Sequence, residues 1–381
     1  MAEYLLCSLL AVICAFVYDC CGACHSQNSS IASSSRSGVM AGNPLFRYLA
    51  LWSGACVLWL LAGMRGKYVG ADTRLYLQEF STIVHHSGGY VHSDWGFRRF
   101  NMLVGLFSMN GNIFLLVCSG IAIFGFYYLA SYFQGTMGIS VLFFITSFNY
   151  FQIYSLIAQY TALGFLFIGT RFLLERKYAV AYIFVLLAGF MHSSAWIFIV
   201  FFVIKTAMDI MNNAWHLSLV SLAGLVCFAI VAKGVMPIIL KSTRFAVYYQ
   251  RDDTNLNSTS ILLISLAVLA FSTLVFAIRS AIRNNSKYQL FYIIVIFGVI
   301  CSLLQNQVPL IVRMSIYCIA FYPIVIPLFI QALPREDLRV AASVLVIAAF
   351  AAWFFIYPLR LNYYEVFPYE AVPWFSLDVA S

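Results

Sequence analysis

A carboxylate at a helix start is the first feature with chemical potential. Asp72 lies in the polar segment 65–80, directly after an apolar run, and is followed by Tyr76 and Glu79 at helical spacing. Such a group at a membrane surface could accept a proton from a sugar hydroxyl or hold an arginine. The same pattern, with Gly70 two residues earlier, also starts helices, because the N-cap position favours Asp. On spacing alone we favour the cap over catalysis.

A histidine lies inside an apolar run. His192 falls within 179–204, where Met191 precedes it and two serines follow. Imidazole titrates near neutrality, and an ionisable group at membrane depth is a functional-site hypothesis by default. The alternative is a neutral histidine that is hydrogen-bonded to the backbone where a helix breaks. The residues alone leave the two interpretations even.

Other reactive residue types form weaker patterns. Two adjacent acids, Asp252 and Asp253, could ligate a divalent cation, but we favour a solvated loop. His85, His86 and His92 have no fixed metal-ligand spacing. The string 21–25 spells C-x-x-C-H, the haem-attachment sequence, but no second haem ligand is identifiable. We therefore expect no metal and no other cofactor.

The elements that carry these residues are membrane helices. Hydrophobic residues make up 63% of the 381 residues and charged residues only 9%, against about 25% charged in soluble domains. Continuous apolar runs, each near the length of about 20 residues that a helical crossing needs, exclude a soluble enzyme and a β-barrel. The net charge of +8 indicates helix orientation and lipid headgroups rather than nucleic acid. We predict an all-α polytopic membrane protein with about 11 transmembrane helices. The apolar runs lie near 4–18, 47–64, 112–133, 137–152, 155–174, 179–204, 215–233, 260–279, 287–304, 309–331 and 338–357.

The polar segments divide a single integral membrane domain, 1–381. Lys and Arg divide equally between the two sides, eleven and eleven, whether the run 179–204 crosses once or breaks near His192 and returns. We prefer the break, because it places short basic turns inside, where the positive-inside rule holds best. The basic residues that remain outside would be explained by an anion-binding site. The segments are a flexible linker at 19–46, an outer loop with an interfacial helix at 65–99, a second outer loop at 233–259 and an aromatic interfacial tail at 358–381.

Several short strings, taken together, resemble one protein family. They are Gly70-Ala-Asp-Thr with Tyr76, Trp95-Gly-Phe, Phe190-Met-His-Ser-Ser-Ala, Arg313-Met-Ser-Ile-Tyr and Val366-Phe-Pro-Tyr. In this order and spacing, over 48–372, the chain resembles the EpsG/Wzy family of polysaccharide polymerases. It departs from the family at 158–162, where Ala-Gln stands in place of a frequent Arg-Gln. If that arginine grips a phosphate in relatives, another must do so here.

The resemblance implies a glycosyltransferase of GT-C-like architecture that acts outside the cytoplasm. A hydroxyl of one undecaprenyl-pyrophosphate-linked repeat unit would attack the anomeric carbon of another glycan, and the lipid pyrophosphate would leave. Such a site needs a base, for which Asp72 and His192 are the candidates. It also needs a clamp, for which arginine offers a planar fork of donors that stays charged. The substrate and pyrophosphate candidates are Arg65, Arg74, Tyr76, Arg244, Arg251 and Arg313.

Arg313 is the most notable of these, because it directly precedes an apolar helix, although a helix-end arginine also snorkels to headgroups. The predicted function is a Wzy-type polysaccharide polymerase in a bacterial inner membrane. Its partners would be the lipid-linked oligosaccharide donor and acceptor, membrane lipids and a chain-length regulator protein. The alternatives are an O-antigen ligase, which uses the same donor, and a transporter or flippase of the lipid-linked oligosaccharide. No paired inverted repeat of the kind found in transporters is evident.

Overall fold

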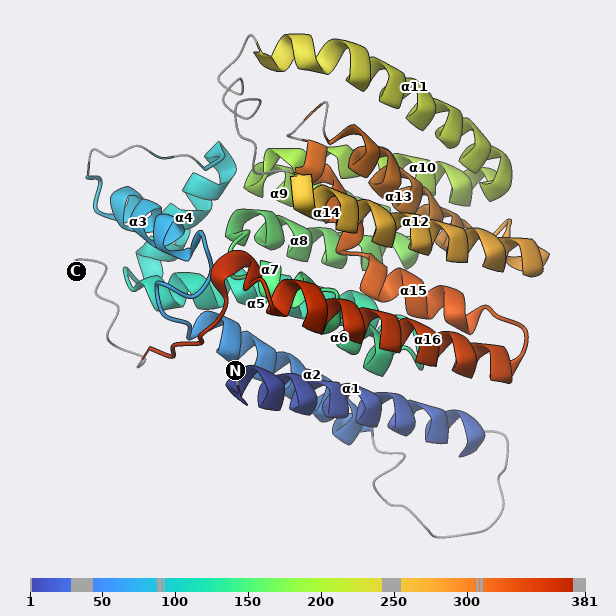
Figure 1. Cartoon of the computed structure of the whole chain (residues 1–381), viewed down its shortest axis with the longest axis horizontal. Coiled ribbons are helices and arrows are strands. Elements are labelled where there is room, and N and C mark those ends of the chain that lie inside the picture. Colours follow the sequence, from blue (N-terminus) through green and yellow to red (C-terminus); the bar gives the residue numbers. More distant parts are fainter. Residues whose placement is uncertain are drawn as a thin grey trace. The chain divides into compact units, whose positions relative to one another are not determined.

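A computed structural model describes residues 2–28, 44–87, 91, 93–241, 255–305, 308 and 311–372. These residues form helices and no β-strand, with one isolated antiparallel bridge between Arg65 and Ala371. The α-helices, labelled in Figure 1, are α1 (Ala2–Asn28), α2 (Pro44–Gly63), α3 (Thr73–Val84), α4 (Trp95–Phe107), α5 (Gly111–Ala130), α6 (Met137–Thr146), α7 (Asn149–Gln152), α8 (Ile157–Leu174), α9 (Tyr178–Met191), α10 (Phe198–Met211), α11 (Ala214–Lys241), α12 (Asn255–Ile278), α13 (Ser286–Leu304), α14 (Val312–Ile319), α15 (Tyr322–Gln331) and α16 (Glu336–Phe354). Short helical turns lie between or after these helices, at Ser193–Ile197, Ser280–Ile282, Phe355–Leu359 and Tyr363–Glu365.

Among the described residues, nine helices are long and apolar enough to cross a membrane, and α14 with α15 makes a tenth, bent by 43°. This confirms an all-α polytopic membrane protein. About eleven helices were expected. The run 137–152 is not among the observed spans, because it forms only the ten-residue α6 and the four-residue α7. At 1.5 Å per residue α6 spans roughly 15 Å, about half of the hydrocarbon core.

The run 179–204 breaks and returns, as the preferred topology required. The Tyr178 hydroxyl donates to Asp209, and the Tyr182 and Thr206 hydroxyls lie 3.3 Å apart, so α9 and α10 run antiparallel. The short helical turn Ser193–Ile197 follows His192 and connects the two helices. Each arm has 14 residues, or roughly 21 Å. His192 and Tyr178 therefore lie at opposite ends of α9.

Two of the polar segments are more helical than expected. α1 continues to Asn28 and α2 begins at Pro44, so the predicted linker 19–46 is helical at both margins. Within the predicted loop 233–259, α11 extends to Lys241 and α12 begins at Asn255. A helix that is already nucleated gains one hydrogen bond for each residue it adds, so it continues past the apolar stretch that started it.

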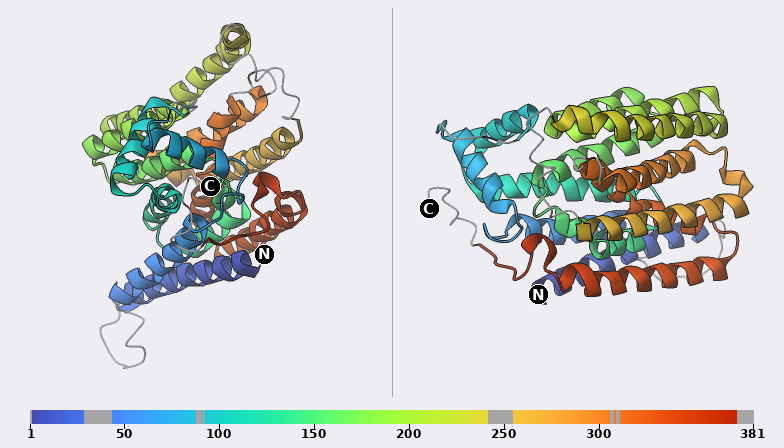
Figure 2. Two further views of the ribbon diagram at one scale, coloured as in Figure 1. Left: turned by 90° about the vertical axis from the view of Figure 1, so that its left-hand side faces the viewer. Right: turned by 45° about the horizontal axis from the view of Figure 1, so that its top comes forward.

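The chain packs as two compact units. Unit 1 comprises residues 1–172, 183–196 and 344–381, and unit 2 comprises 173–182 and 197–343. In unit 1, α1 packs along α2 and α6, α2 packs along α5, and α3 and α4 lie beyond one end of the long helices (Figures 1 and 2). In unit 2, α13 is central and packs on α10, α11, α12 and α14. We predicted one membrane domain, and the division into two compact units does not test that prediction.

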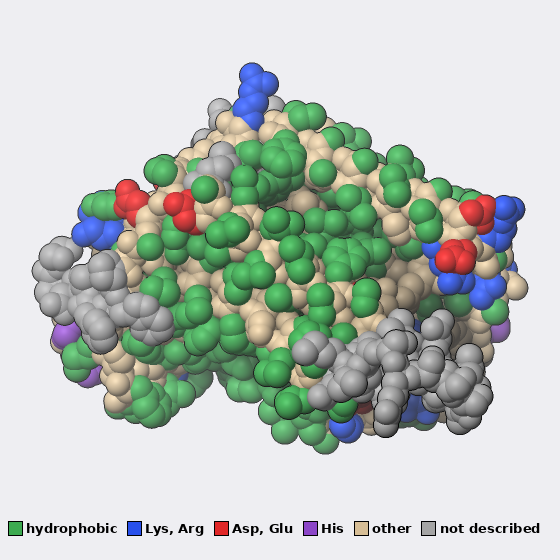
Figure 3. Space-filling model, turned by 90° about the horizontal axis from the view of Figure 1, so that it is seen from below, with side chains coloured by type: hydrophobic (Ala, Val, Ile, Leu, Met, Phe, Trp, Pro, Cys, Tyr) green, Lys and Arg blue, Asp and Glu red, His purple; other side chains and the backbone are tan. Residues whose placement is uncertain are grey.

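Lipid-facing surface is recognisable on the outer helices. Leu6 of α1, Ile238 of α11 and Leu345 of α16 each expose about 70% of their area. Figure 3 shows that hydrophobic side chains make up much of the exposed surface that it draws. Contiguous exposed apolar area on this scale is expected where lipid replaces water.

Candidate functional site

Arg65 lies two residues after the end of α2 and is almost completely buried. Its guanidinium donates to the carbonyl of Ala62, to the carbonyl of Tyr154 at 3.2 Å and to the Thr73 hydroxyl at 3.2 Å. It also lies 4.9 Å from the centre of the Tyr154 ring. Burial lowers the pKa of the Arg65 guanidinium, and these acceptors compensate for the lost water. Three N–H groups of Arg65 are thus bonded within the protein, which suits a residue that holds the loop, and its role as a pyrophosphate clamp stays a prediction.

The loop after Arg65 is packed tightly against the segment before α8. Gly70 has φ of +98°, and a Cβ there would lie 2.6 Å from the Tyr154 carbonyl oxygen. The Thr73 hydroxyl lies 2.7 Å from the same oxygen and 2.8 Å from the Val69 carbonyl oxygen. Only glycine combines the left-handed conformation with this close approach. The backbone conformation and the close packing therefore require glycine at the first position of the Gly-Ala-Asp-Thr string.

Asp72 occupies the N-cap position of α3, but its side chain makes no capping hydrogen bond. Its φ and ψ of −102° and −1° are helical, whereas a capping residue adopts an extended conformation that aims its oxygen at the first free N–H groups. The side-chain cap that we favoured on spacing alone is therefore wrong. The Asp72 side chain is half-buried at the start of α3, and its predicted catalytic role stays a prediction.

The C-terminal segment pairs with the Asp72 loop through its backbone. Within the predicted aromatic tail, Tyr369 donates its hydroxyl to the Leu61 carbonyl at 3.0 Å, and burial raises the pKa of Tyr369 to about 12. Sequence reasoning missed this pairing, because backbone hydrogen bonds leave no side-chain signature. The four backbone bonds are Gly66 N–H to Glu370 O (2.7 Å), Gly70 N–H to Glu365 O (2.9 Å), Ala71 N–H to Tyr364 O (2.8 Å) and Val372 N–H to Met64 O (3.0 Å).

α3 and α4 form the end of unit 1 next to this loop. The rings of Tyr76 on α3 and Phe97 on α4 meet edge to face at 5.9 Å. α4 buries Phe97 and exposes 82% of Leu106 and 84% of Phe107, which is the amphipathic pattern expected of an interfacial helix. Glu79 accepts from the Ser93 backbone at 2.8 Å and fixes the segment that enters α4.

The start of α4 is docked on the break that contains His192. The Asp94 carboxylate accepts from the Ser193 backbone N–H at 2.6 Å. A Cβ on Gly96 would lie only 2.1 Å from the Phe190 carbonyl oxygen, so the two backbones touch. Trp95 and Phe190 add a ring contact at 6.3 Å. Asp94 is a positioning residue that sequence reasoning missed, although the Trp-Gly-Phe string beside it was singled out.

The structure thus connects some predicted residues and leaves others apart. α4 contacts both segments, since Phe97 meets the ring of Tyr76, one turn after Asp72, and Gly96 lies against Phe190, two residues before His192. Arg74 is exposed, two residues after Asp72. Arg313 is half-buried at the start of α14, in unit 2. Arg244 and Arg251 lie outside the described residues.

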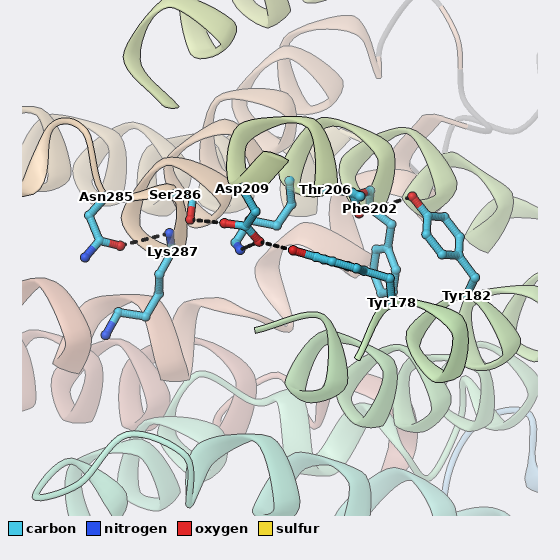
Figure 4. Close-up of polar contacts among 9 residues, drawn as sticks. Tyr178, Tyr182, Phe202, Thr206, Asp209, Asn285, Ser286 and Lys287 are labelled. Carbon is cyan, nitrogen blue, oxygen red and sulfur yellow. Dashed lines mark hydrogen bonds and ion pairs between the residues drawn. The ribbon is translucent and has the colours of Figure 1, made fainter. Parts of the chain in front are cut away.

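A second polar cluster lies in unit 2 and was also missed. Lys205 and Asp209, one turn apart on α10, form an ion pair at 2.5 Å whose side chains are only 3% and 2% exposed. Asp209 also accepts from the Ser286 hydroxyl at 2.6 Å and from the Tyr178 hydroxyl at 3.2 Å (Figure 4). The cluster therefore ties α9, α10 and α13 together. Its signal in the sequence is the Lys and Asp at helical spacing at the end of an apolar run.

Metal ligands do not gather in the part of the chain that the structure describes, where no three His, Cys, Asp or Glu residues form a group that could hold an ion. His92, Asp252 and Asp253 lie outside these residues. The expectation that the protein uses no metal therefore stays a prediction.

The comparison with protein families matches the EpsG family over residues 53–371, which is most of the chain. No match was found among curated proteins or among solved structures. The matched range contains the Asp72 loop, the start of α4, the break at His192 and the C-terminal segment that pairs with the loop. The chain belongs to the EpsG family.

Proposed function

We propose that this protein is a Wzy-type polysaccharide polymerase that joins lipid-pyrophosphate-linked oligosaccharide repeat units at the outer face of a bacterial inner membrane. Membership of the EpsG family supports a polysaccharide polymerase in general terms. The many membrane spans support a lipid-linked substrate, whose chain would stay in the bilayer while the sugars react at the surface.

The observation that carries the proposal is the construction around Asp72. Its carboxylate takes no part in the helix cap, and the residues on either side of it are held in place: the C-terminal segment bonds Gly70 and Ala71, and Arg65 donates to Thr73. A catalytic group must be held within a fraction of an ångström, and such support is what a rigid scaffold supplies. His192 belongs to a segment that α4 connects to the same end of unit 1.

The proposed reaction is a displacement at the anomeric carbon. The acceptor hydroxyl forms the new C–O bond, its proton passes to Asp72 or His192, and the bond to the pyrophosphate oxygen breaks with the electron pair leaving on the lipid pyrophosphate. Arg74, the exposed arginine nearest in sequence to Asp72, suits the clamp role. Arg65, Arg244, Arg251 and Arg313 stay proposed clamp residues.

The test is a strain that lacks this gene, complemented with wild type, Asp72→Asn or the control Asp337→Asn. Asp337 is an exposed acid paired with Arg335, and such pairs contribute little. We expect single repeat units in the deletion, and long chains again with wild type and the control only. The readouts are a gel of surface polysaccharide and mass spectrometry of lipid-linked glycans.

Two other outcomes would replace the proposal. If the deletion accumulates long lipid-linked polymer that is not transferred, the protein is a ligase. If single lipid-linked units accumulate on the cytoplasmic face, it is a flippase. If chains are restored by Asp72→Asn at the wild-type level, the polymerase assignment stands but Asp72 does not act in it.

A further inference from the structure

Arg47 lies in the first turn of α2, and its guanidinium rests on α1. It lies 4.2 Å from the centre of the Tyr18 ring. A Cβ on Gly22 would lie 2.9 Å from the Arg47 Nη2 atom, so the guanidinium also lies across the backbone of α1. The side chain is half-buried, and its Nε is buried without a hydrogen-bond partner. Arg47 is therefore held by an aromatic ring and a glycine, and neither neighbour supplies a negative charge.

The carboxylate beside Tyr18 serves a different helix. Oδ2 of Asp19 accepts from the Gly138 N–H of α6 at 2.8 Å. The first N–H groups of a helix have no partner within it and carry a partial positive charge, so they favour a carboxylate. In the part of the chain that the structure describes, no ion pair joins Asp19 to Arg47. Asp19 is therefore engaged by α6 rather than paired with Arg47.

A second arginine approaches the same tyrosine from α8. Arg171 donates to the Tyr128 carbonyl at 2.6 Å and to the Ser131 hydroxyl at 2.8 Å. Its guanidinium lies 4.1 Å from the centre of the Tyr128 ring. The Tyr18 hydroxyl donates to the Ser131 carbonyl at 3.4 Å, so Ser131 connects Tyr18 to Arg171.

The charge and the surface at this end of unit 1 fit one class of ligand. Arg47, Arg171 and Asp19 act electrostatically on the Tyr18 hydroxyl, and together they leave one net positive charge. Exposed apolar side chains lie on the same two helices, at Leu45, Tyr48 and Leu49 of α2 and at Ile13 and Phe16 of α1. A phospholipid carries a charged phosphate next to apolar chains, so it matches both features. Inorganic phosphate would match only the charge.

We propose that Arg47 binds the phosphate of an anionic phospholipid, whose acyl chains lie along the exposed apolar side chains of α1 and α2. Arginine presents a planar fork of donors that matches phosphate oxygens and stays charged. Arg171 adds positive charge, and the Tyr18 ring keeps the Arg47 guanidinium in place.

The position of Arg47 along α2 agrees with this ligand. The 20 residues of α2 rise roughly 30 Å, so Arg47 lies at the opposite end of the helix from the Asp72 loop. In the predicted topology that loop is outside, which places Arg47 at the cytoplasmic leaflet. Anionic lipids give this leaflet its negative surface potential. The lipid site is therefore separate from the candidate catalytic site and does not depend on the proposed reaction.

The test measures lipid binding to the purified full-length protein. Wild type in neutral detergent is titrated with dioleoylphosphatidylglycerol, with dioleoylphosphatidylcholine or with inorganic phosphate, and the thermal midpoint is followed. We expect the midpoint to rise with phosphatidylglycerol only, and native mass spectrometry to show this lipid bound. A hydrogen bond to a charged group is worth roughly ten- to hundredfold in affinity, so Arg47→Gln should need at least about ten times more phosphatidylglycerol for the same rise.

Two further variants separate the planar fork from the charge alone. Arg47→Lys keeps the positive charge but loses the fork, so its affinity should lie between those of wild type and Arg47→Gln. Where Arg47→Gln yields too little folded protein, Arg47→Lys carries the test. Arg335→Gln is the matched control, because it removes an exposed arginine that pairs with Asp337. It should bind phosphatidylglycerol within about twofold of wild type.

Three results would overturn the proposal. If Arg47→Gln binds phosphatidylglycerol as tightly as wild type does, Arg47 is not the phosphate ligand. If phosphatidylcholine raises the wild-type midpoint equally, the net charge of the headgroup is not recognised. If inorganic phosphate raises it equally, the site binds a free anion and not a lipid.

Discussion

The contact between α4 and the break at His192 can be tested by a single methyl group. A Cβ added at Gly96 would lie 2.1 Å from the Phe190 carbonyl oxygen and 2.5 Å from its carbon. Both neighbours are backbone atoms of a helix end and cannot rotate away. Since a carbon rests no closer than about 3.3 Å to a carbonyl oxygen, Gly96→Ala must displace the start of α4 by roughly 1 Å.

That displacement has a calculable consequence. The bond from the Ser193 N–H to Asp94, now 2.6 Å, would stretch beyond hydrogen-bond distance. A misplacement of about 1 Å in a catalytic constellation costs on the order of 100-fold in rate, or about 2.7 kcal/mol. The protein should still insert in the membrane, because the change lies in α4, which is not among the candidate membrane spans. We therefore expect Gly96→Ala to be present at wild-type level and about 100-fold less active.

The control is Gly224→Ala in α11, where an added Cβ meets nothing within 4 Å. It should leave the rate unchanged and stabilise the helix by about 0.5–1 kcal/mol. The assay is polymer formation from lipid-linked units in liposomes, with protein amount measured by immunoblot. A Gly96→Ala protein that keeps half of the wild-type rate would refute the claim that α4 positions the His192 segment.

Two further predictions concern stability. Lys205→Met leaves the buried Asp209 without its cation, which should lower the free energy of unfolding by about 3–5 kcal/mol. The double variant Lys205→Met with Asp209→Leu should recover most of that loss. Thermal unfolding in detergent measures both variants, and equal midpoints for the single and the double variant would contradict this prediction. Tyr369 has a pKa raised from 10.0 to about 12, so the unfolded chain loses its proton first and stability should fall as pH rises from 10 to 12. Tyr369→Phe should show a smaller fall over the same range, and an identical fall would exclude Tyr369 as a contributor.

The family and the fold class were predictable from the sequence, because both depend on features that are local along the chain. Runs of about 20 apolar residues define helices wherever they pack, since a bilayer requires each backbone group to be satisfied within its own segment. The break at His192 was also predictable, because 26 apolar residues exceed one crossing and short basic turns favour the return. The string around Asp72 located the candidate loop without any structure.

What the tertiary structure decided is the environment of individual side chains in that loop. Arg65 and Arg74 look alike in sequence, but one is buried among carbonyls and the other is exposed. The sequence predicts that Asp72 caps α3, yet its backbone is helical and its side chain makes no capping hydrogen bond. The pairing of the loop with the Glu365 turn joins residues nearly 300 positions apart through backbone groups that every residue type possesses. Spacing along a chain carries no record of such contacts, because they depend on how helices far apart in the sequence pack in space.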